Sequence, residues 1–407
     1  MYYPLDQQSA LDYVRKSSLM TQIFGEKDDL KAVDLAEGNI NLIFRVYSER
    51  DPIAKSVLIK QALPHSRRYP QFKIPLDRAR IEYEALQLEG RYCPEQVPRV
   101  YRYDPEMHLN VMEDMNRHMV MRYGLMKQVQ YPFFAAHIGT FLARTLFYTS
   151  DFYLSSFDKK AMVPRFINPV LCKVTEDLVF TEPYIDHPNN RWTRLLDPQV
   201  TEIRRNEELR SEVLLLKLYF MCNAQALVHG DLHTGSIMVN GEETKVIDPE
   251  FAYFGPMGFD IGAVLGNLAL SYASQEYHAK DPRLRAEYRE WLLDTIRQVW
   301  TIFEKEFRRL WEAEGNEQWP SVSLRDKYLK RLLQDTAGFG ACKMMRRILG
   351  LAHVPDLDSI DDEHMRAVAE SLALNIARSW LMDRHRFASV EDLISAIKAS
   401  ESSYPIA

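Results

Sequence analysis

Two acidic residues on either side of a short hairpin constrain the fold of this chain more than any other feature of its sequence. Asp231 lies in the run VHGD, Asp248 lies in the run VIDPE, and the pair Asn240-Gly241 stands between two short apolar runs that separate them. An Asn-Gly pair in that setting predicts a tight β-hairpin. Phosphotransferases use such an arrangement to place a proton-accepting carboxylate near a second carboxylate that binds magnesium. We therefore expect Asp231 to accept the proton of a substrate hydroxyl and Asp248 to bind Mg²⁺.

The tripeptide Asp248-Pro249-Glu250 extends the predicted metal site. A residue before proline is biased toward extended backbone, and residues i and i+2 of an extended segment point to the same side. We therefore expect the carboxylates of Asp248 and Glu250 to converge on one Mg²⁺ ion, which prefers oxygen ligands. The alternative is that the tripeptide forms only a turn.

A hydrolytic metal site is a competing hypothesis for the same segment. His229, Asp231 and His233 alternate along the chain and would share one side of an extended strand. Such a site needs further ligands, of which Asp248 could be one. It would leave the features of the first third of the chain without a function, and the simplest alternative treats both histidines as ordinary structural residues.

The first third of the chain has the residues of a nucleotide site in their expected order. The segment 37–39 (Glu-Gly-Asn) precedes a predicted strand, and its glycine permits a tight turn over phosphates. Lys60 follows the apolar run VLI, from which its ammonium could reach two phosphates. Glu82 and Glu84 both lie on the next predicted helix, and periodicity does not decide which of them orients Lys60.

The pattern of the chain changes near residue 115, and we expect an α+β fold of two lobes. Residues 1–115 form the predicted nucleotide-binding lobe, built on a sheet and opened by a helix with Ser9 and Asp12 as a capping box. Residues 116–407 form the predicted helical lobe for catalysis and substrate binding. The expected strands are Leu42–Tyr47, Val57–Ile59 and Leu109–Met112, with a β-like segment at Ile237–Ile247, and the expected helices are Leu76–Glu89, His137–Phe147, Leu209–Val228, Ile261–Tyr272 and Ala286–Trp311.

Composition and charge restrict the partners and the location that we expect. The chain has 51 Lys+Arg and 57 Asp+Glu, a net charge of -6, which does not favour binding to nucleic acid. Its 4 cysteines form no CxxC pair, so a reducing cytoplasm is the simplest location. The first residues lack the pattern of a signal peptide, and the apolar stretches are too short or interrupted for a membrane span. We expect no nucleic-acid partner and no membrane contact.

With these residues assembled, the chain resembles the protein-kinase-like superfamily in its aminoglycoside and choline kinase branch and, more narrowly, the methylthioribose kinase family. Ser236 stands where most relatives carry a metal-binding asparagine, and Glu250 stands where protein kinases have a glycine. The methylthioribose kinase pattern shares both departures. The runs that carry the resemblance are Val228–Ser236, Lys245–Pro256 and Arg346–Val354, with weaker matches at Gly38–Asn41, Asp77–Glu82 and Val111–Asp114.

The resemblance implies an antiparallel sheet in the first lobe and ATP-dependent phosphorylation of the anomeric hydroxyl of 5-methylthioribose in methionine salvage, with Mg²⁺ as cofactor and a homodimer as the assembly. By motif position, it implies that Asn41 and Lys60 meet the nucleotide phosphates, that Glu82 belongs to the same nucleotide site, and that Glu113, Asp114 and Met115 form the adenine hinge. It also implies that Asp231 meets the sugar as the base, that Asp248 and Glu250 bind Mg²⁺, and that Arg346 and Arg347 serve the substrate and the transferred phosphate.

Three alternatives to these expectations stay open. The substrate could be another small hydroxyl compound such as choline, homoserine or an aminoglycoside, although choline would want an aromatic cage and an aminoglycoside an acidic patch. The chain could also be a nucleotide-binding scaffold without activity. Finally, Arg346 and Arg347 could form a solvated helix face, since adjacent helical residues point about 100° apart.

Overall fold

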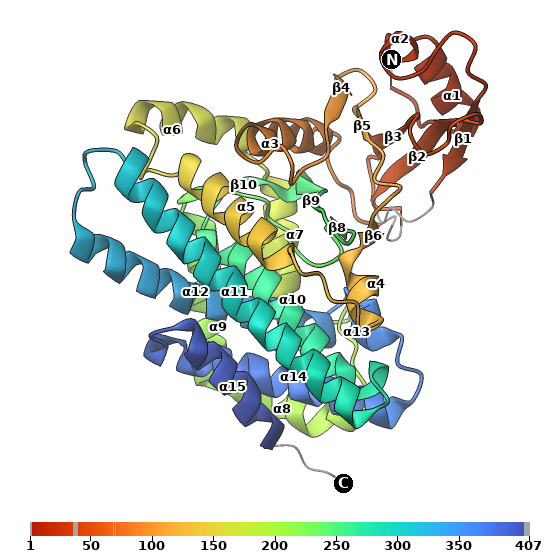
Figure 1. The fold of residues 1–407 in the computed structure, drawn as a ribbon. Coiled ribbons are helices and arrows are strands. Elements are labelled where there is room, and N and C mark those ends of the chain that lie inside the picture. The colour runs from red at the N-terminus through yellow and green to blue at the C-terminus, as the bar shows by residue number, and fades with distance from the viewer. Residues whose placement is uncertain (1, 36–39, 68, 70, 403–407) are drawn as a thin grey trace.

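A computed structural model describes residues 2–35, 40–67, 69 and 71–402. Its N-terminal part contains, within those residues, an antiparallel sheet of five strands in the order β1-β2-β3-β5-β4 (Figure 1). The strands are β1 Leu30–Asp34, β2 Asn41–Ser48, β3 Ser56–Ala62, β4 Val100–Asp104 and β5 Leu109–Glu113, and helix α3 Arg78–Tyr92 lies between β3 and β4 in the chain. The three predicted strands and the predicted helix of this region are confirmed.

A helix precedes the sheet and covers part of it. Ala10 and Val14 of α1 (Gln7–Arg15) are buried together with Phe44 of β2 and Val111 of β5. The predicted capping box was wrong by three residues, because Asp6 is the N-cap residue. Its carboxylate accepts a hydrogen bond from the Ser9 amide at 2.7 Å, and the Ser9 hydroxyl accepts one from the Asp6 amide at 2.8 Å. Ser9 is therefore the N3 residue of the box, not its N-cap.

The rest of the chain is mainly helical and confirms the α+β class (Figure 1). Its principal helices are α4 Met121–Met126, α5 Phe134–Tyr148, α6 Ser156–Met162, α7 Pro169–Phe180, α8 Asp197–Arg205, α9 Glu207–Cys222, α10 Met257–His278, α11 Pro282–Glu314, α12 Val322–Leu349, α13 Pro355–Asp358, α14 Glu363–Asp383 and α15 Val390–Ser402. Among the described helices, none has the length and apolar character needed to cross a membrane.

Short strands interrupt the helices around the predicted site. The expected hairpin is present as β8 (Ile237–Val239) and β9 (Thr244–Val246), and β6 (Met119–Val120) pairs with β8. The helix predicted at Leu209–Val228 ends at Cys222 instead. The last residues of the predicted range form strand β7 (Ala226–Val228), which pairs with β10 (Tyr253–Gly255). The prediction failed there because an apolar run is compatible with both a buried helix and a buried strand.

Helices α10 and α12 approach closely at the centre of the helical part. A Cβ atom on Gly262 of α10 would lie 2.5 Å from the Thr336 carbonyl oxygen and 2.7 Å from the Gly340 nitrogen, both on α12. Glycine at position 262 therefore permits the two backbones to approach more closely than any other residue would allow. The close crossing fixes the C-terminal half of α12 against α10, whose first turn supports the loop that carries Asp231.

Candidate active site

The loop that carries Asp231 is fixed by its own backbone and by helix α10. Gly230 has a φ of +85°, and a Cβ atom there would lie 2.3 Å from the Phe251 carbonyl oxygen. Asp260, in the first turn of α10, accepts hydrogen bonds from the amides of His229 at 2.6 Å and Gly230 at 3.0 Å. A buried carboxylate thus anchors the two residues that precede Asp231.

Both carboxylate oxygens of Asp231 face nitrogen atoms. Lys343 Nζ lies 3.0 Å from Oδ1, and His233 Nε2 lies 3.3 Å from Oδ2. Burial raises the pKa of Asp231, but Lys343, His233 and Arg346 outweigh burial and bring it well below its usual range. Asp231 is therefore ionised and able to accept a proton at neutral pH, as the predicted general base must be.

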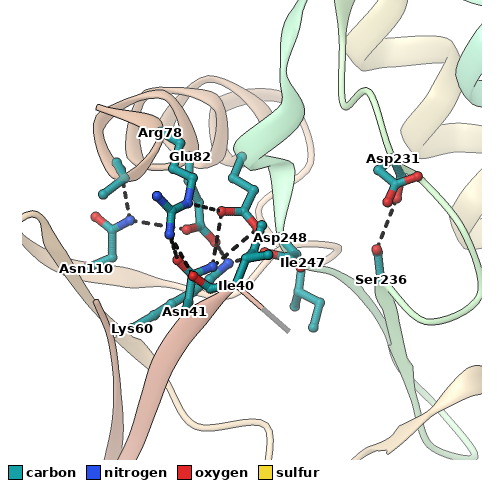
Figure 2. Close-up of polar contacts among 12 residues, drawn as sticks. Ile40, Asn41, Lys60, Arg78, Glu82, Asn110, Asp231, Ser236, Ile247 and Asp248 are labelled. Atoms are coloured by element: carbon teal, nitrogen blue, oxygen red, sulfur yellow. Dashed lines mark hydrogen bonds and ion pairs between the residues drawn. The ribbon is translucent and has the colours of Figure 1, made fainter. Parts of the chain in front are cut away.

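Ser236 supports the loop from within. Its hydroxyl donates to the backbone carbonyl of Asp231 at 3.0 Å, as Figure 2 shows. The residue is buried, on the chain between Asp231 and strand β8. This contact gives Ser236 a structural role in the loop.

The geometry does not favour the hydrolytic metal site. His229 Nε2 lies 2.9 Å from the Ile247 carbonyl oxygen, and its Nδ1 accepts from the Asp231 amide at 3.3 Å. Both ring nitrogens of His229 are thus engaged by backbone, whereas His233 contacts Asp231. Within the ranges that the structure describes, no group of three or more His, Cys, Asp and Glu side chains is arranged to bind a metal.

A second polar cluster lies where the sheet meets the helical part (Figure 2). Lys60 of β3 contacts Glu82 of α3 at 2.7 Å and also forms an ion pair with Asp248. Burial lowers the pKa of Lys60, but Asp248 and Glu82 together raise it above its usual value. Glu84 points elsewhere, to Arg80 at 3.0 Å and Arg165 at 3.0 Å. The structure therefore selects Glu82 over Glu84 as the partner of Lys60.

The backbone at Asp248 differs from our expectation. Asp248 is in the left-handed region, at φ 73° and ψ 40°, and Pro249–Phe251 forms a short 3₁₀ turn. The prediction of an extended segment was wrong because tertiary contacts override the local bias that proline imposes. The charge of Asp248 nonetheless acts on Glu250. Burial and then Asp248 raise the pKa of Glu250 to about 7.

Arg78 is a residue of this cluster to which the sequence assigned no role. It is fully buried in the first turn of α3, and its Nε donates to Glu250 Oε2 at 3.0 Å. Its other nitrogens donate to the Leu63, Pro75 and Ile40 carbonyls and to Asn41 Oδ1, at 2.7–2.8 Å. Asn41 Nδ2 in turn donates to Glu250 at 3.1 Å. The signal available in the sequence was the spacing of Arg78 and Glu82, which places both on one face of α3.

The predicted adenine hinge lies at the end of strand β5. Glu113 is the last residue of β5, Asp114 forms an ion pair with Arg45 at 2.6 Å, and Met115 is buried. The backbone thus leaves the sheet where the adenine contact is predicted, but the roles of these three residues stay predictions. The glycine turn predicted at residues 37–39 lies outside the described residues.

Arginines gather around Asp231 from two other elements. Arg346 and Arg347 of α12 are buried, and so is Arg122 of α4. Arg347 donates to the Ala352 carbonyl at 3.1 Å, and Arg122 contacts Asp356 at 2.8 Å. The buried Nε of Arg346 has no hydrogen-bond partner among the described residues. The hypothesis of a solvated helix face is therefore wrong.

Lys343 and Arg122 are the residues of this cluster that sequence reasoning missed. Lys343 stands three residues before Arg346, so the three cations Lys343, Arg346 and Arg347 occupy one turn of α12. That spacing was the available signal for Lys343. Arg122 is brought in from α4 by the fold and had no signal in the sequence.

Comparison with known proteins agrees with this geometry. The model of a phosphotransferase enzyme family matches residues 170–310. Methylthioribose kinase 1 of Oryza sativa subsp. japonica is 40% identical over 98% of this chain and 96% of its own length. The methylthioribose kinase of Geobacillus kaustophilus is 39% identical over 96% of both chains, and that of Yersinia enterocolitica is 39% identical over 98% of both.

The chain belongs to the methylthioribose kinase family. The fold comparison is compatible with that membership, since the choline kinase of Cryptosporidium parvum superposes with a TM-score of 0.51. The two chains are 15% identical, and the superposition covers 97% of this chain and 100% of the choline kinase chain. At that identity the comparison supports the protein-kinase-like fold alone. Asp231, Asp248 and Glu250 lie in the runs that carry the resemblance to methylthioribose kinases.

Proposed function

We propose that this chain transfers the γ-phosphoryl group of ATP to the anomeric hydroxyl of 5-methylthioribose, giving 5-methylthioribose 1-phosphate and ADP in methionine salvage. Asp231 takes the hydroxyl proton, and Arg346 and Arg347 stabilise the charge of the transferred group. Lys60, oriented by Glu82, and Asn41 serve the nucleotide phosphates, and residues 113–115 form the adenine hinge.

One observation carries this proposal: buried cations outnumber their acidic partners beside Asp231. Lys343 pairs with Asp231 and Arg122 pairs with Asp356, whereas the described residues include no carboxylate in an ion pair with Arg346 or Arg347. A buried guanidinium without a counter-ion is costly. An anion that arrives next to Asp231 would offset that cost, and phosphoryl transfer delivers one there.

The carboxylates of the second cluster fit a divalent cation. Asp248 and Glu250 are close enough for Asp248 to raise the pKa of Glu250, and the Asp248 side chain is 41% exposed. Asp248 is thus the open side of the site, and Glu250 is buried beside it, where it accepts from Arg78 and Asn41. Mg²⁺ takes one or two carboxylates together with phosphate oxygens, which these two acids could supply. We propose that Asp248 and Glu250 are its protein ligands. When bound, Mg²⁺ neutralises charge on the ATP phosphates.

The test is a steady-state assay of the purified protein with ATP and Mg²⁺ against a panel of acceptors. We expect 5-methylthioribose to be phosphorylated at the anomeric position and ribose to be about 10–200-fold poorer, because an apolar substituent contributes that much discrimination. Choline, homoserine and an aminoglycoside serve as controls for the alternative kinases. Equal use of ribose, or better use of choline, would contradict the proposal.

We also propose a cytoplasmic homodimer whose protomers divide into lobes at residues 115 and 116. The free state of all four cysteines suits a reducing compartment. Helix α9 offers a surface for self-association, since several of its apolar side chains are more than half exposed. They are Leu214, Leu215, Leu218 and Met221. Sedimentation of the parent and of Leu218→Glu tests this, and a parent that sediments as a monomer would contradict it.

A further inference from the structure

Lys343 contacts the proposed base and is shielded from solvent. Its side chain is 3% exposed, and its ammonium lies 3.0 Å from Asp231 Oδ1 and 4.2 Å from the centre of the Phe259 ring. The face of an aromatic ring attracts an ammonium group, so Phe259 stabilises Lys343 in this position. Phe259 belongs to α10 and Lys343 to α12, so the close crossing of those helices sets the distance to Asp231.

The other oxygen of Asp231 is also held by a defined donor. The Gly235 amide donates to His233 Nδ1 at 3.0 Å, so Nδ1 is the unprotonated nitrogen and Nε2 carries the proton. That Nε2–H faces Asp231 Oδ2 at 3.3 Å. Burial lowers the pKa of His233 to about 4, so the ring is a neutral donor near pH 7. Lys343 therefore supplies the one full positive charge in contact with the carboxylate among the described side chains.

We propose that Lys343 is a positioning residue of the transfer reaction: its ammonium keeps the buried Asp231 carboxylate ionised and orients it toward the substrate hydroxyl. This inference rests on the proposed function, which makes Asp231 the base. In the reaction the hydroxyl oxygen bonds to the γ-phosphorus, the bond from phosphorus to the ADP oxygen breaks, and the hydroxyl proton goes to Asp231. Lys343 keeps its own proton throughout.

Among the charges around Asp231, Lys343 lowers the pKa of that carboxyl the most. Burial alone would favour the protonated form of Asp231, which cannot accept a proton. Burial also lowers the pKa of Lys343, to about 8, while Asp231 opposes that shift. The charged and titratable groups around this pair are His233 from the same loop, Arg346 and Arg347 from α12, and Asp260 from α10.

The experiment compares the pH dependence of kcat for the parent, Lys343→Met, Lys343→Arg and the exposed control Lys327→Met on the same helix. We expect Lys343→Met to lower kcat by about 10²-fold or more and to move the acid limb of the profile upward by at least about one pH unit, because Asp231 loses its counter-charge. Lys343→Arg should restore most of kcat and return the acid limb to its parent position. Lys327→Met should match the parent.

A parent-like acid limb in Lys343→Met would overturn the inference and leave Lys343 with a role in packing only. Should Lys343→Met fail to fold, Lys343→Gln takes its place, since it keeps the stem and a hydrogen bond without the charge. The thermal stabilities of Asp231→Asn, Lys343→Gln and the double variant test the coupling of the pair without substrate. A parent inactive on 5-methylthioribose would contradict the proposed function, whereas additive stabilities would contradict the present inference.

Discussion

Arg78 and Glu250 form a buried ion pair at 3.0 Å that joins helix α3 to the segment carrying Asp248, although 172 residues separate them in the chain. The side chains are 0% and 2% exposed. Arg78 also reaches Asn41, at the start of β2, so one guanidinium connects the sheet, α3 and the predicted metal site. The relative placement of Lys60 and Asp248 therefore depends on Arg78.

Removal of Arg78 should damage both stability and activity. Arg78→Met leaves Glu250 and several backbone carbonyls without their donor, and loss of one partner of a buried ion pair costs about 3–5 kcal/mol. Urea denaturation at pH 8, where Glu250 is ionised, measures the free energy of unfolding. Arg80→Met on the same helix is the matched control, since Arg80 forms partly exposed ion pairs. A loss of stability no larger than that of Arg80→Met would contradict this role.

Magnesium dependence should change with pH through Glu250. Its pKa of about 7 lies above its ordinary value of 4.5, so the carboxylate is increasingly protonated as pH falls through 7. A proton and Mg²⁺ compete for the same oxygens. We expect the Mg²⁺ concentration for half-maximal rate to rise as the pH falls from 8 to 6.

Glu250→Gln should require more Mg²⁺ than the parent at pH 8 and should lose the pH dependence. Asp248→Asn should be more severe, and a parent-like Mg²⁺ titration of Glu250→Gln would refute Glu250 as a ligand.

The choice of Glu82 over Glu84 can be tested with one matched pair. Glu82→Gln removes the charge that orients Lys60 and weakens one buried charged contact. We therefore expect a higher KM for ATP and a decrease in kcat of at most about 10-fold. Glu84→Gln alters the contacts with Arg80 and Arg165 and should leave both constants near those of the parent. Equal effects of the two substitutions would place the partner of Lys60 elsewhere.

The guanidinium of Arg346, which forms no ion pair with a carboxylate of the described residues, should act on the transition state. Arg346→Met should lower kcat for 5-methylthioribose by about 10²–10³-fold, as expected for the loss of one group that stabilises developing charge. The dissociation constant of ATP should stay near the parent value, which calorimetric titration measures. Arg331→Met, at a 70% exposed arginine of the same helix, is the control. Parent-like kcat in Arg346→Met would remove the arginine from the site.

Much of the fold and part of the site were predictable from local sequence. Strands, helices and the Asn240-Gly241 turn are set by residues close together in the chain, so hydrophobic periodicity and turn chemistry predict them. Lys60, Asp231 and Asp248 were found in the same way, from the local runs around each of them. The apolar run at residues 209–228 was ambiguous for the same reason. It satisfies the pattern of a helix and of a buried strand alike, and only the pairing of β7 with β10 separates the two.

Other features were decided by tertiary structure alone. Periodicity placed Glu82 and Glu84 on one helix, but the contact with Lys60 depends on how α3 packs against β3. Proline predicted an extended Asp248, but Asp248 adopts a left-handed backbone, and Glu250 in the 3₁₀ turn after it pairs with Arg78 of a distant helix. Lys343 meets Asp231 across 112 residues of chain. Local sequence determines which conformations a segment prefers. The partner of a buried charge is set by the packing of elements that are distant in the chain, because this packing removes the charge from water and makes a partner necessary.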